Sequence, residues 1–420
     1  MRNWAGNYRY RARRLHEPRS MDELQQLVRT STSLRAVGSR HSFNDVADTH
    51  GDLVSVASMP RIFELNRSTQ TVAVNGGMRY GDFCAPLDRV GFALHNLGSL
   101  PHISVAGSCA TGTHGSGLAN GNLSTAIVEA EIVRGDGELV VVTAAEPQSL
   151  RAVAVSIGCL GIITRLTLAA EPAYQMQQDV FEDLPLDAFI DHFPEIVGAG
   201  DSVSFFTGWS GRTIDQVWVK RRTDPVTTLA PLDLFGATAA TRQRHPIPGF
   251  PPEACTPQLG VPGPWFERLP HFRMDHTPSS GDELQSEYFV GREHAVEAFL
   301  ALHSIHEEIA PLIQVSEIRA IAEDDLFLSP ATGRPSIAFH FTWRPDWPSV
   351  RDLLPMIERA LGPFDPRPHW GKLFTLPPET LRARYARLSD FLVVFEAFDP
   401  AGTFRNAFVD RYVFGRSSSP

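Results

Sequence analysis

Cysteine is scarce in this chain of 420 residues. The four cysteines, which are Cys84, Cys109, Cys159 and Cys255, lie far apart and form no Cys-x-x-Cys pair. That spacing favours neither a disulfide framework nor a zinc site. Since unpaired thiols are typical of reducing compartments, we expect a cytoplasmic protein.

Long apolar runs are absent as well. None approaches the roughly 20 residues that a membrane span requires, and the first residues lack the apolar segment of a secretory signal. The sequence therefore predicts no membrane association.

Basic residues are in the minority, with 38 Lys and Arg against 48 Asp and Glu and a net charge of −10. Because binding to nucleic acid needs a basic face, we expect no nucleic-acid partner.

The remaining composition is typical of a globular chain with many turns. Hydrophobic residues make up 43% of the chain, and glycine and proline number 32 each, which favours a substantial β content. A chain of this length exceeds one ordinary hydrophobic core, so we expect two domains. Nothing in the sequence requires an assembly larger than a monomer, and only residues 417–420 are low in complexity.

Local patterns predict much of the secondary structure. Ser20 and Glu23 form a capping box at the start of a helix that continues to Val28. We expect β-hairpins at 61–74 and at 126–143, and an ordered, proline-rich covering loop at 244–264. Further strands are predicted at 8–15, 53–57, 161–169, 202–209, 214–220, 314–322 and 336–343. Further helices are predicted at 80–90, 147–157, 292–309, 350–361 and 381–387.

A glycine loop, Gly38-Ser39-Arg40-His41-Ser42, follows a predicted buried strand at 34–37. Glycine tolerates positive φ and lets backbone N–H groups approach a ligand closely. Successive N–H groups in such a turn form a concave anion site that suits a pyrophosphate. The alternative is a polar turn without a function.

Residues 99–117 form the most informative segment. They include no charged residue when both histidines are neutral, and almost no bulky side chain. Small hydroxyl residues and bare backbone favour a wall against a large planar or phosphorylated cofactor, and a closely packed core helix is the alternative. The Gly-x-Gly-x-x-Gly spacing of a Rossmann turn is absent. His102 and His114 have no further ligands at a suitable spacing, so we expect no metal site.

Two predicted strands carry polar residues two positions apart. Glu317 and Arg319 point to one face of their strand, and so do His340 and Thr342. Inward-facing groups of these types would cost too much free energy unless they were paired or solvated. They are therefore candidates for a binding pocket, with a surface salt bridge between Glu317 and Arg319 as the alternative.

These segments together carry a resemblance. Residues 38–44 (GSRHSFN), 99–108 (SLPHISVAGS) and 110–117 (ATGTHGSG) resemble the flavin domain of the vanillyl-alcohol oxidase superfamily. Within it, the chain is similar to the alditol oxidase group over essentially its whole length. Residues 3–7 (NWAGN) and 367–372 (RPHWGK) match that group too.

The resemblance implies an α+β, two-domain FAD-binding fold of the vanillyl-alcohol oxidase type. The FAD-binding domain would span 1–171, and a mixed α+β substrate-binding (cap) domain would span 172–374. A C-terminal segment, 375–420, would return to the FAD-binding domain.

The resemblance also implies an FAD that is bonded covalently to His41 through its 8α-methyl group. The loop from Gly38 to Ser42 would hold the pyrophosphate, Ile163 would meet the adenine end, and Asn406 would lie beside the isoalloxazine. The implied FAD-binding residues are Gly38, Ser39, Arg40, His41, Ser42, Ser99, Ser104, Gly107, Thr111, Gly112, Thr113, His114, Ile163 and Asn406. Arg40 stands where the family often has glycine, so its backbone lacks the ready access to positive φ that glycine has.

The implied reaction is the oxidation of a terminal primary hydroxyl of an alditol, such as xylitol or sorbitol, to the aldose. Hydride would pass to flavin N5, and molecular oxygen would be reduced to hydrogen peroxide. The implied polyol-binding and catalytic residues are Ser99, Glu317, Arg319, His340, Thr342 and Lys372. A polyol offers many hydroxyls and no charge, which a pocket of donors and acceptors suits. His340 or Lys372 is the candidate base.

Three rival hypotheses remain. One is a sugar-1,4-lactone oxidase or dehydrogenase of the same superfamily. Another is a flavoprotein that carries FAD without turnover. The third is a non-enzymatic carbohydrate-binding protein that stacks sugars on Trp265, Trp343 and Trp370.

Overall fold

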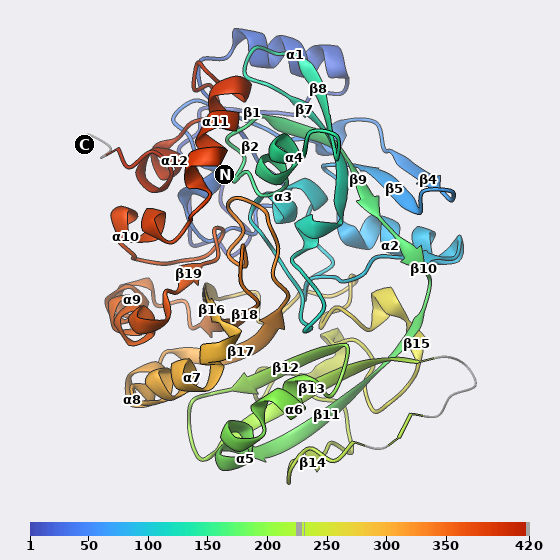
Figure 1. Cartoon of the computed structure of the whole chain (residues 1–420), viewed down its shortest axis with the longest axis vertical. Helices are drawn as coiled ribbons and strands as arrows, with labels where there is room; N and C mark the ends of the chain where they lie inside the picture. Colours follow the sequence, from blue (N-terminus) through green and yellow to red (C-terminus); the bar gives the residue numbers. More distant parts are fainter. Residues whose placement is uncertain (224–228, 231, 417–420) are drawn as a thin grey trace.

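The computed structural model describes residues 1–223, 229–230 and 232–416 (Figure 1). The tail at 417–420, which the sequence marks as low in complexity, lies outside the described residues.

A small parallel sheet begins the fold, in the order β1-β3-β2. Its strands are β1 (Leu15–His16), β2 (Leu34–Ala36) and β3 (Asp52–Val54), and α1 (Met21–Thr30) joins the first two. Ser20 accepts a hydrogen bond from Glu23 N, as predicted, but the Glu23 carboxylate bonds Arg19 N, so the box is only half formed.

The strand predicted at 8–15 is wrong for most of its length. Only Leu15 joins β1, and Arg9 makes a single bridge to Arg2. The reason is Asp48, whose carboxylate accepts hydrogen bonds from Arg11 N and from the Tyr8 hydroxyl. The Asp48 side chain therefore accepts the hydrogen bond from Arg11 N that a neighbouring strand would otherwise accept.

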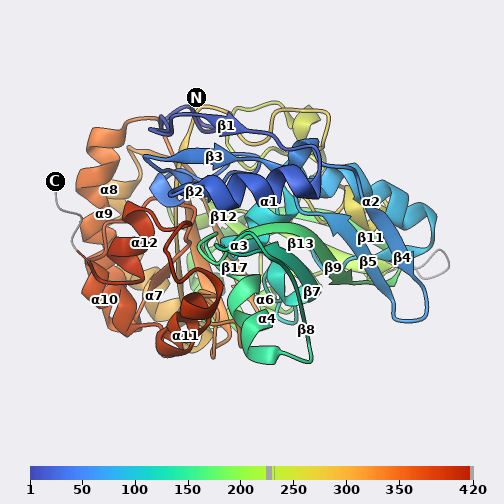
Figure 2. The same cartoon turned by 90° about the horizontal axis from the view of Figure 1, so that it is seen from above.

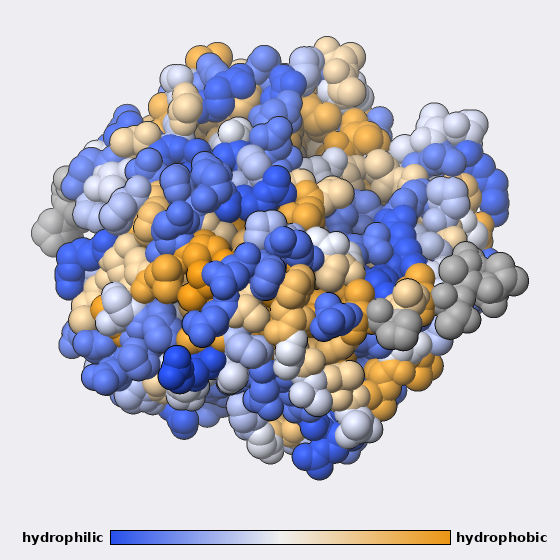
Figure 3. Space-filling model, turned by 60° about the horizontal axis from the view of Figure 1, so that its bottom comes forward, coloured by the Kyte–Doolittle hydropathy of each residue, from blue (hydrophilic) through white to orange (hydrophobic). Residues whose placement is uncertain are grey.

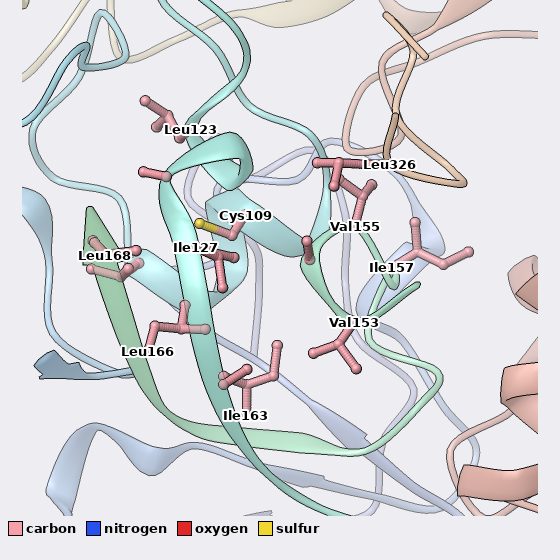
Figure 4. Packing of buried hydrophobic residues seen from close by; sticks show 14 of the residues in the cluster. Cys109, Leu123, Ile127, Val153, Val155, Ile157, Ile163, Leu166, Leu168 and Leu326 are labelled. Atoms are coloured by element: carbon pink, nitrogen blue, oxygen red, sulfur yellow. The ribbon is translucent and has the colours of Figure 1, made fainter. Parts of the chain in front are cut away.

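An antiparallel sheet follows, in the order β4-β5-β9-β7-β8. Both predicted hairpins are confirmed here, because each pairs across a short polar turn. The strands are β4 (Phe63–Asn66), β5 (Thr71–Asn75), β7 (Ile127–Val133), β8 (Leu139–Thr143) and β9 (Ile162–Ala169). The helices near them are α2 (Tyr80–Arg89), α3 (Val105–Ala110) and α4 (Pro147–Ala154), of which α3 packs on β9 and α4 on β7 and β8. Figure 4 shows part of the hydrophobic core between these elements, including Cys109, Ile127 and Leu166.

A large antiparallel sheet forms the lower half of Figure 1, in the order β14-β11-β13-β12-β17-β18-β16-β19, with β15 also paired to β11. Its strands are β11 (Gln175–Pro185), β12 (Ser202–Thr207), β13 (Thr213–Thr223), β14 (Thr238–Ala239), β15 (Gly263–Pro264), β16 (Leu284–Gly291), β17 (Ile313–Ile321), β18 (Ser336–Trp343) and β19 (Arg367–Pro368). A separate pair joins β6 (Phe92–Ala93) to β10 (Glu171–Pro172). The predicted strands at 314–322 and 336–343 are confirmed, whereas β16 was not predicted.

One face of the large sheet is covered by helices. These are α5 (Leu186–Asp191), α6 (Phe193–Val197), α7 (Ala295–His303), α8 (His306–Ile309) and α9 (Trp347–Leu361). Their apolar side chains join those of the strands in a second hydrophobic core, in which Phe189 packs against Phe205 and Phe299. The helix predicted at 292–309 is broken, because Ser304 and His306 side chains bond the carbonyls at the end of α7.

The C-terminal helices, α10 (Pro378–Ala383), α11 (Leu388–Phe398) and α12 (Ala407–Tyr412), follow the large sheet in the chain. In Figure 2 α12 lies near β2 and α11 near α4. Helix α11 packs against α4, and α12 packs against the 3-10 turn at Asp45–Ala47. The helix predicted at 381–387 straddles the end of α10 and the turn after it, and α11 was missed. The domain bounds at 171 and 374 stay a prediction, and Leu326 to Leu328 from the predicted cap pack in the first core.

The surface in Figure 3 alternates hydrophilic and hydrophobic patches. Among the described residues, no helix combines the length and the apolar character needed to cross a membrane. Cys84, Cys109, Cys159 and Cys255 are free thiols, and all four are buried.

Candidate active site

A cavity of about 500 Å³ lies between the glycine loop, the small-residue segment and the large sheet. The proline-rich stretch covers part of it through Pro246 and Ile247, in agreement with the sequence prediction. The predicted site residues that line the cavity are Gly38, Ser39, Arg40, His41, Ser42, Ser99, Ser104, Gly107, Thr111, Thr113, His114, Ile163, Glu317, Arg319, His340, Thr342 and Lys372.

Two of the predicted FAD-binding residues do not line the cavity. Asn406 caps α12, and its amide donates to the carbonyls of Asp45, Val46 and Asp48, so its polar atoms are used within the fold. Gly112 has a φ of +70°, and a Cβ there would lie 3.0 Å from Pro330 Cδ, which makes it a turn residue behind the cavity wall.

The glycine loop and the small-residue segment are in direct contact. Ser39 N donates to Ser104 Oγ over 3.3 Å, and Ser104 N donates to Ser39 Oγ over 3.0 Å. A Cβ on Gly38 would lie 2.1 Å from Ser104 Oγ, and one on Gly107 would lie 2.7 Å from the same atom. A side chain at either position would therefore displace Ser104 Oγ, which accepts the hydrogen bond from Ser39 N.

The glycine loop lines the cavity and contains backbone donors without partners. Within the part of the chain that the structure describes, the N–H groups of Arg40, His41 and Ser42 have no hydrogen-bond partner. Arg40 takes a left-handed φ of 65°, the conformation that a glycine would adopt without strain. Consecutive free N–H groups beside a glycine form the kind of concave site that binds phosphate oxygens, so the loop fits the pyrophosphate of FAD.

His41 is poised as a neutral imidazole. Burial lowers its pKa to about 4, with His102 and Arg40 acting in the same direction. Its Nδ1 lies 3.0 Å from Ser39 Oγ, while its Nε2 is buried and has no partner among the described residues. A buried polar atom without a partner is costly, which fits a site that another group completes.

Polar residues form a row across three strands of the large sheet. Glu287 on β16 pairs in register with His340 on β18, which pairs with Glu317 on β17. All three side chains project into the cavity from one face of the sheet. The row comprises two buried carboxylates, so nearby cations must compensate their charge.

Glu287 is the central member of this cluster, and it is not among the site residues predicted from the sequence. It is 1% exposed, and its carboxylate contacts Arg319 Nη2 at 2.6 Å and Lys372 Nζ at 2.7 Å. His114 Nε2 lies 3.2 Å away. Although burial alone would raise the pKa of Glu287, Lys372, His114 and Arg319 hold it well below its usual value. The alternation of Glu283, Gln285 and Glu287 is the same period-two signal that identified Glu317 and Arg319, and it could have located this strand.

Lys372 and His340 form a close pair. Lys372 Nζ lies 2.6 Å from His340 Nδ1, and His340 Nε2 lies 3.1 Å from Thr342 Oγ1. Burial and the adjacent Lys372 lower the pKa of His340 to about 4, so this imidazole is neutral. Burial also lowers the pKa of Lys372, and Glu287 opposes that effect in part.

Glu317 and Arg319 face the cavity together with Ser99. Arg319 Nη1 donates to Ser99 Oγ over 3.3 Å, and Arg319 Nε lies 3.5 Å from Glu317 Oε2. Burial raises the pKa of Glu317, but Arg319 and His271 outweigh it and leave the pKa lowered. The surface salt bridge considered for Glu317 and Arg319 is excluded, because neither residue is more than 6% exposed.

The stacking surface considered for a carbohydrate-binding protein is also excluded. Trp265 and Trp343 are 0% exposed and Trp370 is 1% exposed. Each ring is part of a hydrophobic core and is not available to a polysaccharide.

Comparisons with known proteins identify related families. The FAD binding domain family matches residues 12–143, and the D-arabinono-1,4-lactone oxidase family matches residues 282–412. An alditol oxidase of Streptomyces sp. (strain IKD472 / FERM P-14339) is 46% identical over 410 residues, which cover 97% of each chain. An L-gulono-1,4-lactone dehydrogenase of Mycobacterium tuberculosis (strain ATCC 25618 / H37Rv) is 26% identical over 424 residues, 97% of this chain and 98% of that one.

Solved structures of two cholesterol oxidases share the fold. One, a solvent-stable enzyme, superposes with a TM-score of 0.80 at 14% identity and covers 98% of this chain and 97% of that one. The other, from B. sterolicum, has a TM-score of 0.77 at 13% identity, over 98% and 96% of the two chains. The α+β fold expected from the sequence is thereby confirmed.

Proposed function

Because the chain belongs to the alditol oxidase family of FAD-linked oxidases, within the vanillyl-alcohol oxidase superfamily, we propose that it oxidises an alditol at a terminal primary hydroxyl. The product is the aldose, xylitol and sorbitol are the proposed substrates, and molecular oxygen is reduced to hydrogen peroxide. The proposed location is cytoplasmic, which the four free thiols support.

The observation that carries this proposal is the charge balance of the cavity. Two buried carboxylates, Glu287 and Glu317, face two buried cations, Arg319 and Lys372, and the adjacent His340 is neutral. With Lys372 protonated, the cluster therefore has no net charge, and it offers many donors and acceptors. A polyol is uncharged and rich in hydroxyls, so it matches such a pocket, whereas a carboxylate or phosphate substrate would need a surplus of cations.

The proposed FAD site uses the glycine loop for the pyrophosphate and the 104–114 segment as a wall. FAD supplies the two-electron acceptor that the oxidation of an alcohol requires. We propose that His41 bonds the cofactor covalently, since a neutral imidazole is nucleophilic and the environment keeps it neutral at physiological pH. Ile163 lines the cavity beside Gly76 and is the proposed contact at the adenine end.

Lys372 is the proposed base that takes the proton of the reacting hydroxyl. Both nitrogens of His340 are engaged, one with Lys372 and one with Thr342, so His340 has no free lone pair to offer. Lys372 combines a lowered pKa with a neutral neighbour that can accept its hydrogen bond. Arg319 and Ser99 orient the hydroxyl, and Glu317 binds the adjacent ones.

Lys372→Met is expected to lower kcat by about 10²–10⁴-fold, the usual contribution of a general base. In the wild type, kcat should rise with pH as Lys372 loses its proton, and the variant should lose this limb of the kcat profile. An unchanged profile would transfer the role to another group.

A substrate panel tests the function. Peroxide formation should be at least about a hundredfold more efficient, as kcat/KM, with xylitol and sorbitol than with sugar 1,4-lactones, because the hydrogen-bonding cavity discriminates against ligands that leave its groups unpaired. A preference for a lactone would replace the proposal with the second candidate, a sugar-1,4-lactone oxidase. That candidate is favoured by the family match at 282–412, which includes Glu287, Glu317 and Lys372.

The covalent bond has its own test. Acid precipitation should leave the wild-type protein yellow, and His41→Ala should release its flavin to the supernatant. Release of flavin from the wild type would overturn the covalent assignment without affecting the proposed substrate.

A further inference from the structure

A buried chain of hydrogen bonds leads from the cavity back into the large sheet. His271 Nε2 lies 2.7 Å from Glu317 Oε1, and His271 Nδ1 lies 3.1 Å from Lys220 Nζ. Lys220 belongs to β13, which is separated from β17 by β12. Lys220 is 1% exposed and does not line the cavity, so its influence on a ligand must pass through its neighbours.

The donors of Lys220 determine how His271 is protonated. The ammonium has three N–H bonds and no acceptor, and its partners are Leu269 O, Pro270 O and His271 Nδ1. His271 Nδ1 must therefore accept, which leaves the imidazole hydrogen on Nε2. From there it donates to Glu317, so Lys220 selects the tautomer that orients this carboxylate.

The same lysine holds the loop that positions Ser99. Lys220 bonds the carbonyls of Leu269 and Pro270, and the next two backbone N–H groups, of His271 and Phe272, donate to Ser99 O. The imidazole is enclosed by Trp218 and Phe206, whose ring centroids lie 5.2 and 5.5 Å from its own. Glu317 and Ser99 thus share one buried support.

Lysine itself is unusual in this chain. Of the 38 Lys and Arg residues, only Lys220 and Lys372 are lysines. Lys372 lines the cavity. Lys220 contacts His271, which also lines the cavity, but does not reach the cavity itself. Lysine changes its protonation readily when buried, whereas arginine stays charged.

We propose that Lys220 is a positioning residue for the substrate cavity, which acts through His271 and the 269–271 loop to orient Glu317 and Ser99 toward the polyol. This inference rests on the proposed function, in which Glu317 and Ser99 contact the substrate.

The proposal predicts a pH dependence of substrate binding. Burial lowers the pKa of Lys220 to about 7; Glu317 and Cys255 oppose this, Arg319 and Arg268 add to it, and His271 is its direct partner. As pH rises through this value, Lys220 becomes an amine with two N–H bonds for three acceptors, so it no longer holds His271 Nδ1 as an acceptor. The orientation of Glu317 then weakens, so KM for the polyol rises with pH, and Lys220→Met should abolish this rise.

The holoenzyme allows a direct measurement, because only two lysines contribute signals. With [ε-¹³C]lysine, one of two resonances should titrate near pH 7 and disappear in Lys220→Arg. A Lys220 resonance that does not titrate between pH 6 and 9 would overturn the pH dependence.

Kinetics of the variants test the positioning role. Lys220→Met should raise KM for xylitol by about tenfold below pH 7, the effect of losing one buried hydrogen bond, with kcat within about threefold of the wild type. The difference in KM should shrink above pH 7, where the wild type has lost the same interaction. Flavin absorbance and the melting temperature confirm that the variant is folded. A wild-type KM, or a loss confined to kcat, would overturn the proposal.

A conservative exchange at His271 provides a second line of evidence. Glutamine can accept from Lys220 and donate to Glu317, so His271→Gln should retain a KM closer to the wild type than His271→Leu does. An equal rise in KM in His271→Gln and His271→Leu would show that the hydrogen bonds of the imidazole do not contribute to substrate binding. If the wild type oxidises a lactone and no polyol, the proposed function fails. The positioning role of Lys220 is then tested by measuring KM of the same variants for that lactone.

Discussion

The indole of Trp4 stacks on the imidazole of His41, with ring centroids 5.1 Å apart and 23° between the planes. Hydrogen bonds fasten the same N-terminal segment to the glycine loop. Trp4 N donates to Arg40 O over 2.8 Å, and the Asn3 side chain donates to Ser42 O over 3.0 Å. The N-terminal segment therefore sets the orientation of the ring that we propose as the flavin attachment point.

Trp4→Leu is expected to lower the fraction of covalently bound flavin by at least about twofold, because the His41 ring would no longer be held in one plane. In-gel flavin fluorescence after denaturing electrophoresis measures this fraction. Trp347→Leu serves as the matched control, since Trp347 is 38% exposed at the start of α9. Equal fluorescence in both variants would contradict a positioning role for Trp4.

Gly38→Ala should reduce the flavin-to-protein ratio to below about a tenth of the wild type. The new Cβ would lie 2.1 Å from Ser104 Oγ, a clash that separates the two walls of the cavity. The additional change Ser104→Gly removes the clashing atoms and should restore part of the flavin. Gly362→Ala is the control, because a Cβ there meets nothing within 4 Å. A wild-type flavin-to-protein ratio in Gly38→Ala would show that the glycine loop accommodates the added Cβ without loss of flavin binding.

Glu287→Gln is expected to lower the free energy of unfolding by about 3–5 kcal/mol, because it leaves Arg319 and Lys372 without their shared carboxylate in a buried site. Urea unfolding at pH 7 measures this loss. Glu358→Gln is the control, since the hydrogen-bond donors to this buried carboxylate in the described residues are neutral groups of Tyr288 and Thr375. Comparable losses in the two variants would argue against a cation-specific role for Glu287.

Stability should fall as pH decreases from about 6.5 to 4. His340 has a pKa lowered to about 4 in the folded protein, against about 6.5 in an unfolded chain. The unfolded state therefore binds more protons in this window, and each such histidine contributes a slope of about 1.4 kcal/mol per pH unit. His340→Gln should lessen the slope of the unfolding free energy by that amount. An identical slope in His340→Gln and wild type would contradict the assignment of a neutral buried imidazole.

Elements whose signals are local were predictable from the sequence. The hairpin of β7 and β8 follows from two alternating runs joined by Gly135-Asp136-Gly137, and nothing distant is needed to form it. The helix predicted at 292–309 failed because polar side chains at its middle bond the backbone and end α7, a competition that hydrophobic spacing does not record.

The candidate site likewise has one part that local sequence predicts and another that depends on the tertiary structure. The proposed cofactor side of the cavity comes from two short contiguous segments, whose glycines and small hydroxyl residues can be recognised from local sequence alone. The proposed substrate side is assembled from β16, β17, β18 and the segment at Lys372, so its contacts depend on strand register. Asn406 shows the reverse case, in which a plausible site residue is used by the backbone of a neighbouring turn.

The sequence by itself determined the flavin-type loop, the α+β character and the polar faces of two strands, because these depend on local composition and spacing. Only the tertiary structure decided that Glu287 lies between Arg319 and Lys372, and that Lys220 reaches Glu317 through His271. The physical reason is that the protonation of a buried group depends on which partners surround it, and these partners lie dozens of residues away in the chain.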